Sequence, residues 1–223
     1  ATVYFGTIHK KTIHSIHRLD RETSGLLMLG KNPKTAQVIG ELFEEDKIRK
    51  CYFLIAHKRE GARAFPFVAT EPLGPRPGRP RGMHMANPPE EGKEAETRFE
   101  LIYEKDGYVL ALAFPKSGRQ HQIRIHAAEH GYPLVGDKLY NGDPEIFIRF
   151  KDKVATPEDH EKMQIPRQAL HALALKAPYP DPNQESLYRA PLGEDMLHWL
   201  STRLGLSQAE VETMIERHLL KWI

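Results

Sequence analysis

Two strand-like segments around a tight turn constrain this fold most strongly. Residues 96–103 alternate apolar and polar side chains, and a second strand-like run at 108–114 follows Lys105-Asp106-Gly107. Alternation of this kind indicates a half-buried strand, and a short glycine-containing turn between two such segments indicates a β-hairpin. The sequence therefore predicts antiparallel pairing within residues 96–114.

Helices and further strands surround this hairpin without strict alternation. Asn32-Pro33 resembles an N-cap followed by proline in the first helical turn, and Ser207–Glu210 has the pattern of a capping box. The mixed order of elements predicts an α+β fold without an internal repeat. The predicted strands lie at 26–30, 51–57 and 169–177, and the predicted helices at 33–45, at 120–130 and after Ser207.

Two segments are open to more than one interpretation. Residues 60–93 are rich in Pro and Gly, which predicts a long loop, either a carrier of binding contacts or a dispensable insertion. The C-terminal helix carries an apolar stripe that we expect to pack on the body of the protein, with a partner-binding helix as the alternative. The stripe consists of Val211, Met214, Ile215, His218, Leu219 and Trp222.

Composition narrows the class of protein. No apolar run among the 223 residues approaches the roughly 20 needed to span a bilayer, and the first residues have no apolar core of signal-peptide type. Cys51 is the only cysteine, which fits a cytoplasmic protein. Residues 1–40 hold six Lys/Arg against two acids, and residues 57–82 repeat that ratio. Such local basic excess suggests a polyanionic partner, but charge unevenness of this size is also common on solvated surfaces, which remain the alternative.

The segment from Gly25 to Lys31 has the spacing of a phosphate-binding loop. The four residues between Gly25 and Gly30 are Leu, Leu, Met and Leu, which favour burial in a strand. Asn32 stands where such a loop has the Ser or Thr hydroxyl that holds magnesium. We therefore interpret this segment as a strand between turn glycines, and a nucleotide hydrolase as a minor alternative.

Twelve histidines raise the question of a metal site. His14 and His17 are three residues apart, and His121 and His126 are five apart. Neither spacing matches the His-x-x-x-His pattern of helical zinc hydrolases, and a single cysteine adds no ligand pair. The sequence therefore predicts no metal site.

An acid among cations is the stronger candidate for chemistry. Asp20 lies beside His17, Arg18 and Arg21, and neighbouring positive charge favours the carboxylate form of an acid. A carboxylate of this kind suits a nucleophile or an electrostatic stabiliser better than a proton donor. A second basic cluster, residues 117–126, lies far along the chain at the start of a predicted helix, where Arg119, Gln122 and His126 would share one turn.

These segments resemble the motifs of the RluA/RsuA-type pseudouridine synthases, and the HRLD form of the motif at 17–32, with the GRQHQIRIH pattern in the motif at 117–142, favours the RluA branch. The four segments appear in the family's order and cover most of residues 14–180. They are HRLDRETSGLLMLGKN at 17–32, KCYFLIAHK at 50–58, SGRQHQIRIHAAEHGYPLVGDKLYNG at 117–142 and RQALHALALKAPYP at 167–180.

The resemblance implies a role for each matching residue. Asp20 matches the catalytic aspartate, Tyr52 the tyrosine that stacks on the target uracil and assists proton removal, and Arg124 the arginine that pairs with the aspartate. Arg18 matches an arginine that enters the space left by the extruded nucleotide. Arg119 and His121 would also lie near the RNA.

The resemblance also implies a fold and a partner. The fold would be a mixed, mainly antiparallel sheet with flanking helices and a central cleft, formed by a catalytic domain at 1–182 without the family's usual opening strands. Residues 183–223 would be a helical extension packed on that domain. The activity would be isomerisation of uridine to pseudouridine in structured RNA, rRNA or tRNA, without DNA or a membrane as partner. Because uridine and pseudouridine are isomers, no cofactor is expected. The alternative is an inactive RNA-binding module of the same fold.

Overall fold

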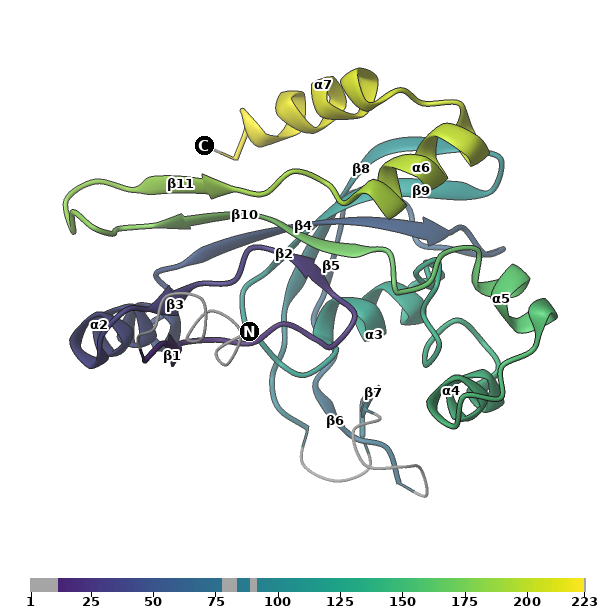
Figure 1. Ribbon diagram of the computed structural model, residues 1–223, viewed down its shortest axis with the longest axis horizontal. Coiled ribbons are helices and arrows are strands. Elements are labelled where there is room, and N and C mark those ends of the chain that lie inside the picture. The colour runs from purple at the N-terminus through teal and green to yellow at the C-terminus, as the bar shows by residue number, and fades with distance from the viewer. Residues whose placement is uncertain (1–11, 78–83, 89–91, 223) are drawn as a thin grey trace.

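A seven-stranded sheet forms the middle layer of the computed structural model, which describes residues 12–77, 84–88 and 92–222 (Figure 1). Its strands are β2 (Ser24–Gly25), β4 (Arg49–His57), β5 (Phe67–Ala69), β8 (Thr97–Lys105), β9 (Tyr108–Pro115), β10 (Leu170–Ala177) and β11 (Ser186–Arg189). Six of them lie in the order β11-β10-β4-β9-β8-β5, and β2 pairs in parallel with β10. All other neighbours are antiparallel, which confirms the predicted class of fold.

The predicted hairpin is the pair β8 and β9. Lys105 pairs with Tyr108 across the turn, where Asp106 and Gly107 both have positive φ, 51° and 77°. A two-residue turn with positive φ at both positions matches the twist of the strands that it joins. The strongest local signal in the sequence is thereby confirmed.

Helices and two small sheets complete the fold. Asn32 caps α2 through a 2.8 Å hydrogen bond from the Thr35 backbone N–H, and Ser207 and Glu210 form the predicted capping box. The small sheets pair β1 (His14–Ser15) with β3 (Leu29–Gly30) and β6 (Leu73–Pro75) with β7 (His84–Ala86). The helices are α2 (Pro33–Glu44), α3 (Gln122–Glu129), α4 (Pro144–Lys151), α5 (Pro157–Met163), α6 (Glu194–Trp199), the π-helical turn η1 (Leu200–Leu204) and α7 (Gln208–Leu219).

Alternation along the central strands divides the core between the two faces of the sheet. Cys51, Phe53 and Ile55 of β4 pack with α6, η1 and α7 on one face. Tyr52 and Leu54 point to the other face, which α3 covers (Figure 1). Because successive side chains of a strand point to opposite faces, Tyr52 shares its face with α3.

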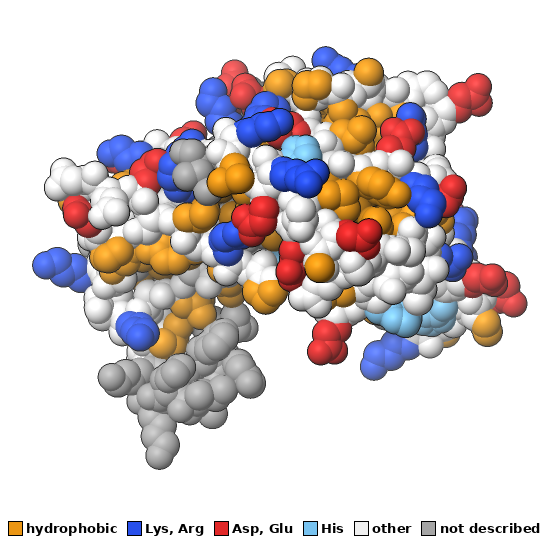
Figure 2. Space-filling model, turned by 90° about the horizontal axis from the view of Figure 1, so that it is seen from above, with side chains coloured by type: hydrophobic (Ala, Val, Ile, Leu, Met, Phe, Trp, Pro, Cys, Tyr) orange, Lys and Arg blue, Asp and Glu red, His pale blue; other side chains and the backbone are white. Residues whose placement is uncertain are grey.

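The C-terminal helices pack closely on the first of these faces. Trp199, Val211, Ile215 and Leu219 are at most 3% exposed and belong to the same cluster as the sheet residues. Seen from above, this side carries Lys/Arg and Asp/Glu side chains dispersed among apolar ones (Figure 2). No helix in the described part of the chain is both long and apolar enough to traverse a bilayer.

The predicted strand at 26–30 is wrong in its extent. Gly25 has a φ of +104° and ends β2, which pairs with β10, whereas strand structure resumes only at Leu29, in a different sheet. Leu26 and Met28, between the two strands, pack with Ile39 of α2. The apolar run therefore reflects packing against a helix and not one continuous strand.

Replacing Gly25 by Ala should destabilise the protein. A Cβ atom at Gly25 would lie 2.2 Å from the backbone oxygen of Ala172, at a φ that side-chain-bearing residues rarely adopt. We expect a loss of about 1–3 kcal/mol of unfolding free energy, measured by urea denaturation. Gly40→Ala is the control, because a Cβ atom there meets nothing within 4 Å. That helical change should raise stability by about 0.5–1 kcal/mol. Equal stability of Gly25→Ala and the parent protein would contradict this account.

The predicted loop at 60–93 contains more structure than expected. It includes β5, β6 and β7, while residues 78–83 and 89–91 lie outside the described residues. Phe67 explains part of the difference, since its ring stacks on Phe99 with centroids 4.8 Å apart and is 4% exposed. Burial of such rings outweighs the turn tendency of the surrounding prolines and glycines.

Candidate functional site

A narrow cavity of about 90 Å³ opens on the α3 side of the sheet. All six site residues predicted from the sequence line it, although they come from three separate segments of the chain. These residues are Arg18, Asp20, Tyr52, Arg119, His121 and Arg124.

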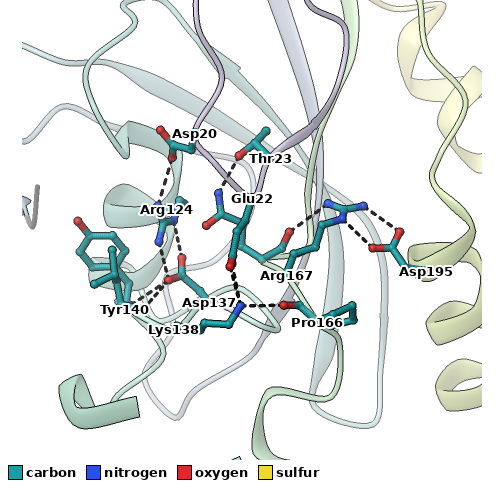
Figure 3. A network of polar contacts seen from close by, with 12 residues as sticks. Asp20, Glu22, Thr23, Arg124, Asp137, Lys138, Tyr140, Pro166, Arg167 and Asp195 are labelled. Atoms are coloured by element: carbon teal, nitrogen blue, oxygen red, sulfur yellow. Dashed lines mark hydrogen bonds and ion pairs between the residues drawn. The ribbon is translucent and has the colours of Figure 1, made fainter. Parts of the chain in front are cut away.

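The loop that carries Asp20 is fixed at three successive points (Figure 3). Arg124 Nη1 donates to Asp20 Oδ2 at 3.2 Å, and Lys138 Nζ donates to both carboxylate oxygens of Glu22 at 2.8 and 2.9 Å. One residue further on, Gln168 Nε2 donates to Thr23 Oγ1 at 2.7 Å. The loop is therefore held by side chains from the segments at 117–142 and 167–180.

Arg124 reaches Asp20 from a buried position on α3. Its Nε and Nη2 donate to the two oxygens of Asp137 at 2.7 and 2.8 Å, and its guanidinium lies 5.0 Å from the centre of the Tyr140 ring. The Arg124 side chain is 5% exposed and that of Asp137 is fully buried. A bidentate pair fixes the plane of the guanidinium. Asp137 thereby leaves Nη1 directed at Asp20.

The charges of this pair are mutually stabilised. Burial alone would raise the pKa of Asp137, but the charge and hydrogen bonds of Arg124, with the backbone N–H groups of Leu139 and Tyr140, hold it below its usual value. Burial likewise opposes the charge of Arg124, and Asp137 and then Asp20 outweigh it, so the Arg124 pKa is raised. The site thus holds a permanent cation against Asp20.

Tyr52 contributes a neutral phenol to the cavity. Burial, followed by the negative charge of Asp20, raises the pKa of Tyr52 to about 12. The phenol therefore keeps its proton at neutral pH. What the site presents at this position is an aromatic ring with an O–H group.

The remaining predicted residues form the rim of the cavity. Arg18 and Arg119 are exposed, and Arg119 Nε donates to the backbone oxygen of Glu94 at 3.0 Å. The ring of His121 hydrogen-bonds the Tyr140 hydroxyl through Nδ1 at 2.8 Å. Exposed guanidinium groups at a rim are suited to contact phosphates.

The predicted helix at 120–130 begins later than expected. His121 adopts a left-handed conformation, with φ 57°, so α3 starts at Gln122. Arg119 therefore does not share a helical turn with Gln122 and His126 as the sequence predicts. It lies in the preceding turn, where its backbone N–H donates to Gln122 Oε1 at 2.9 Å.

Two residues of the site were not singled out by sequence analysis. Asp137 lies in a stretch with turn-like residues, GDKLYNG, and only its complete burial distinguishes it from a surface acid. Lys50 also lines the cavity, and its Nζ donates to the backbone oxygens of Lys116 and Ser117 at 3.3 and 3.2 Å. Burial lowers the Lys50 pKa. The position of Lys50 two residues before Tyr52, on the same face of β4, is the signal that could have indicated it.

His17, three residues before Asp20 in the sequence, has a structural role. His17 Nε2 accepts a 2.9 Å hydrogen bond from the Met28 backbone N–H, and the ring stacks on Phe43. Burial, with a smaller contribution from Lys50, lowers the His17 pKa to about 4. Among the residues that the structure describes, no group of three His, Cys, Asp or Glu side chains is arranged to hold a metal ion.

Chemically, the cavity combines a carboxyl group, a fixed guanidinium and an aromatic ring. A carboxylate supported in this way can attack an electrophilic carbon or stabilise positive charge that develops on it. The ring can hold a flat, unsaturated group by stacking. A flat base attached to a sugar matches this set of groups.

Comparison with known proteins identifies the family. The model of the RNA pseudouridylate synthase family matches residues 7–129, more than half of the chain. An uncharacterised RNA pseudouridine synthase of Zymomonas mobilis is 32% identical over 181 residues, which are 79% of this chain and 71% of that protein. The match to the family model includes Asp20, Tyr52 and Arg124.

Two curated relatives are named as ribosomal large subunit pseudouridine synthases. Ribosomal large subunit pseudouridine synthase C of Buchnera aphidicola is 30% identical over 210 residues, and synthase D of Nitrosomonas europaea is 29% identical over 200. The matches cover 89% and 88% of this chain, but only 60% and 53% of those proteins. Their names agree with the RluA-type resemblance of the motifs.

Solved structures agree on the fold. Human RNA pseudouridylate synthase domain containing 4 superposes with a TM-score of 0.68 at 20% identity, over 89% of this chain and 80% of that one. The human domain containing 1 gives 0.63 at 23% identity, over 81% and 69%. Family model, curated relatives and fold agree, and this chain belongs to the RNA pseudouridylate synthase family.

Proposed function

We propose that this protein is an active RNA pseudouridine synthase in which Asp20 is the catalytic residue. One observation carries the proposal: the Asp20 carboxylate accepts a 3.2 Å hydrogen bond from Arg124 in a cavity that Tyr52 also lines. An RNA-binding module without activity would have no need of a buried cation directed at a single carboxylate. Membership of the family supports the same activity.

The reaction requires little beyond these groups. The bond between C1′ and N1 of uridine breaks, the uracil turns, and a bond forms between C1′ and C5, while the C5 proton leaves and N1 gains one. Asp20 attacks or supports the carbon from which the base departs, and Tyr52 holds the detached uracil by stacking. The isomerisation transfers no electrons and no external group, so this proposal includes no cofactor.

Access to C1′ requires that the uridine leave its stack. Extrusion of a nucleotide costs a few kcal/mol in nucleic-acid enzymes generally. Arg18 is exposed at the rim of the cavity, where it can occupy the vacated space, and Arg119 and His121 line the same cavity. Phosphate contacts from such residues would offset part of the cost.

Ribosomal RNA is the proposed substrate. Two of the relatives are named for the large ribosomal subunit, and tRNA has no such support here. We also include in the proposal that the protein acts in the cytoplasm, because its single cysteine, Cys51, is a buried free thiol. The C-terminal residues 183–223 would act as part of the catalytic domain, because α6, η1 and α7 pack against β4 and β9.

Mapping of pseudouridine in large-subunit rRNA tests this function. We expect at least one uridine to be modified in cells that contain the protein and unmodified in cells that lack it. Purified protein should restore the modification in RNA from the deficient cells. Identical maps from both cells, with no modification by purified protein, would contradict the proposal.

Two substitutions of Tyr52 distinguish the role of its ring from the role of its hydroxyl. Tyr52→Phe keeps the stacking face and removes the O–H group, so a role of the neutral hydroxyl in relaying a proton predicts a single-turnover rate lower by about 10²-fold. Tyr52→Leu removes both and should lose more. Single-turnover kinetics on RNA that contains the target uridine measure the two rates. An unchanged rate in Tyr52→Phe would exclude the hydroxyl from proton transfer and leave stacking as its role.

A further inference from the structure

A second and larger cavity adjoins the candidate active site. Its volume is about 510 Å³, and it shares Asp20, His121 and Arg124 with the first cavity. Its outer wall comes from α4 and α5, which supply Phe147 and Phe150 among other side chains. The mechanism described above uses none of the residues of this wall.

Aromatic and cationic groups dominate the wall. Phe147 and Phe150 are half-buried, so part of each ring remains accessible. Lys138 Nζ lies 5.0 Å from the centre of the Phe150 ring, and the His160 ring meets the same ring edge-on at 4.8 Å. Flat apolar faces backed by positive charge are what proteins use to stack unpaired bases.

The wall is held rigidly in place. Arg149 of α4 donates to both carboxylate oxygens of Asp159 of α5, at 2.7 and 2.6 Å. Ile146 and Met163 anchor the two helices in the core, at 1% and 2% exposure. A pocket fixed before its ligand arrives loses less conformational entropy on binding.

Charge at the cavity is suited to a polyanion. Arg21 and Lys151 line it and are exposed, whereas Glu22 is paired with Lys138. The acids that face the cavity are thus neutralised by buried cations, and basic side chains remain at the surface. Exposed Lys and Arg attract the phosphates on either side of a bound base.

We propose that this cavity holds a second unstacked base of the RNA, immediately next to the target uridine. Continuity with the active site through Asp20 and Arg124 is the reason for placing it one nucleotide away. This inference rests on the proposed function and deepens it. The identity of the neighbouring base would then contribute to the choice of uridine.

Binding of three hairpin RNAs tests the inference. All have the same stem and one loop uridine between two adenosines, and two of them lack the base on the 5′ or the 3′ side of that uridine. Fluorescence anisotropy gives the Kd of each RNA for the parent protein, Phe150→Leu and Val154→Ala. Leu retains an apolar side chain at 150, and thermal unfolding of each variant checks the fold. Val154 is the control, because it lies between α4 and α5, is 63% exposed and does not line the cavity.

The expected result is a coupling between Phe150 and one base. Phe150→Leu should weaken binding of the intact hairpin by about tenfold. For the hairpin that lacks the base held in the cavity, Phe150→Leu and the parent protein should have the same Kd. Val154→Ala should bind all three RNAs as the parent protein does. Equal affinity of Phe150→Leu and parent for the intact hairpin would overturn the inference, as would an equal loss with all three RNAs or no binding by the parent protein.

The outcome is separable from the proposed function. Pseudouridine in rRNA reports on the activity whatever the hairpins show. If rRNA is modified but hairpin binding shows no coupling to Phe150, the proposed second base-binding site is wrong and the proposed enzymatic activity stands. If hairpin binding is coupled to Phe150 but no rRNA is modified, the base-binding cavity stands and the proposed enzymatic activity is wrong.

Discussion

Asp20→Asn should eliminate pseudouridine formation while RNA binding persists. Asn has the shape of Asp but carries no charge and is a poor nucleophile, so it can neither attack carbon nor stabilise a cation there. We expect turnover to fall on the order of 10⁴-fold or more. The fold should survive, because Arg124 keeps its two hydrogen bonds to Asp137. Formation of pseudouridine in the RNA measured in a single turnover, beside the Kd for the same RNA, checks both halves of this expectation.

The control for this substitution is Asp106→Asn. Asp106 is exposed in the β8–β9 turn with a φ of 51°, a conformation that Asn tolerates well. Its activity should match that of the parent protein. Substantial turnover by Asp20→Asn would rule out a nucleophilic role, and loss of RNA binding in the same variant would show that the carboxylate acts chiefly in recognition.

Local sequence signals were sufficient for the central strands β4, β8, β9 and β10 and for helices α2 and α7. The Asp-Gly turn, the Asn32 cap and the Ser207 capping box each act within a few residues, so the patterns that predict them are complete in the sequence. The strand predicted at 26–30 was wrong in extent because Leu26 and Met28 pack with Ile39 of α2, and only residues 29–30 of the segment form a strand. Contacts of that kind do not follow from periodicity.

Only the resemblance to a known family predicted that the site residues lie together in the fold. Asp20 and Arg124 are 104 positions apart, and nothing in the spacing of either segment indicates that they touch. The resemblance of four motifs to one family supplied that link. The resemblance did not predict the contacts that support the loop. Lys138 and Glu22 are 116 positions apart in the sequence, and Gln168 and Thr23 are 145 apart.

Burial was the least visible property of the site in the sequence. Asp137 lies between Gly136 and Lys138 in a segment of turn-like composition, yet its side chain is fully buried. Burial of a charge is tolerated because a partner reaches it from another element, here Arg124 of α3. The sequence displays the acid but not the depth at which it lies.

Asp137→Asn should cost both stability and activity. The substitution leaves the Arg124 cation buried at 5% exposure with Asp20 as its remaining charged partner. Breaking a buried ion pair by removal of one member generally costs about 3–5 kcal/mol of unfolding free energy. The released guanidinium would no longer be held toward Asp20, and a displacement of about 1 Å at a reacting group can cost 10²-fold in rate. Urea denaturation and single-turnover kinetics measure the two losses.

A double substitution separates the two effects. Asp137→Asn with Arg124→Gln removes the stranded charge and places two neutral amides together, so part of the lost stability should return. Activity should stay low, because no cation faces Asp20. If Asp137 acts on the reaction only by positioning Arg124, the activity of the double variant should equal that of Arg124→Gln alone. A further loss of activity in the double variant, with stability recovered, would contradict a positioning role.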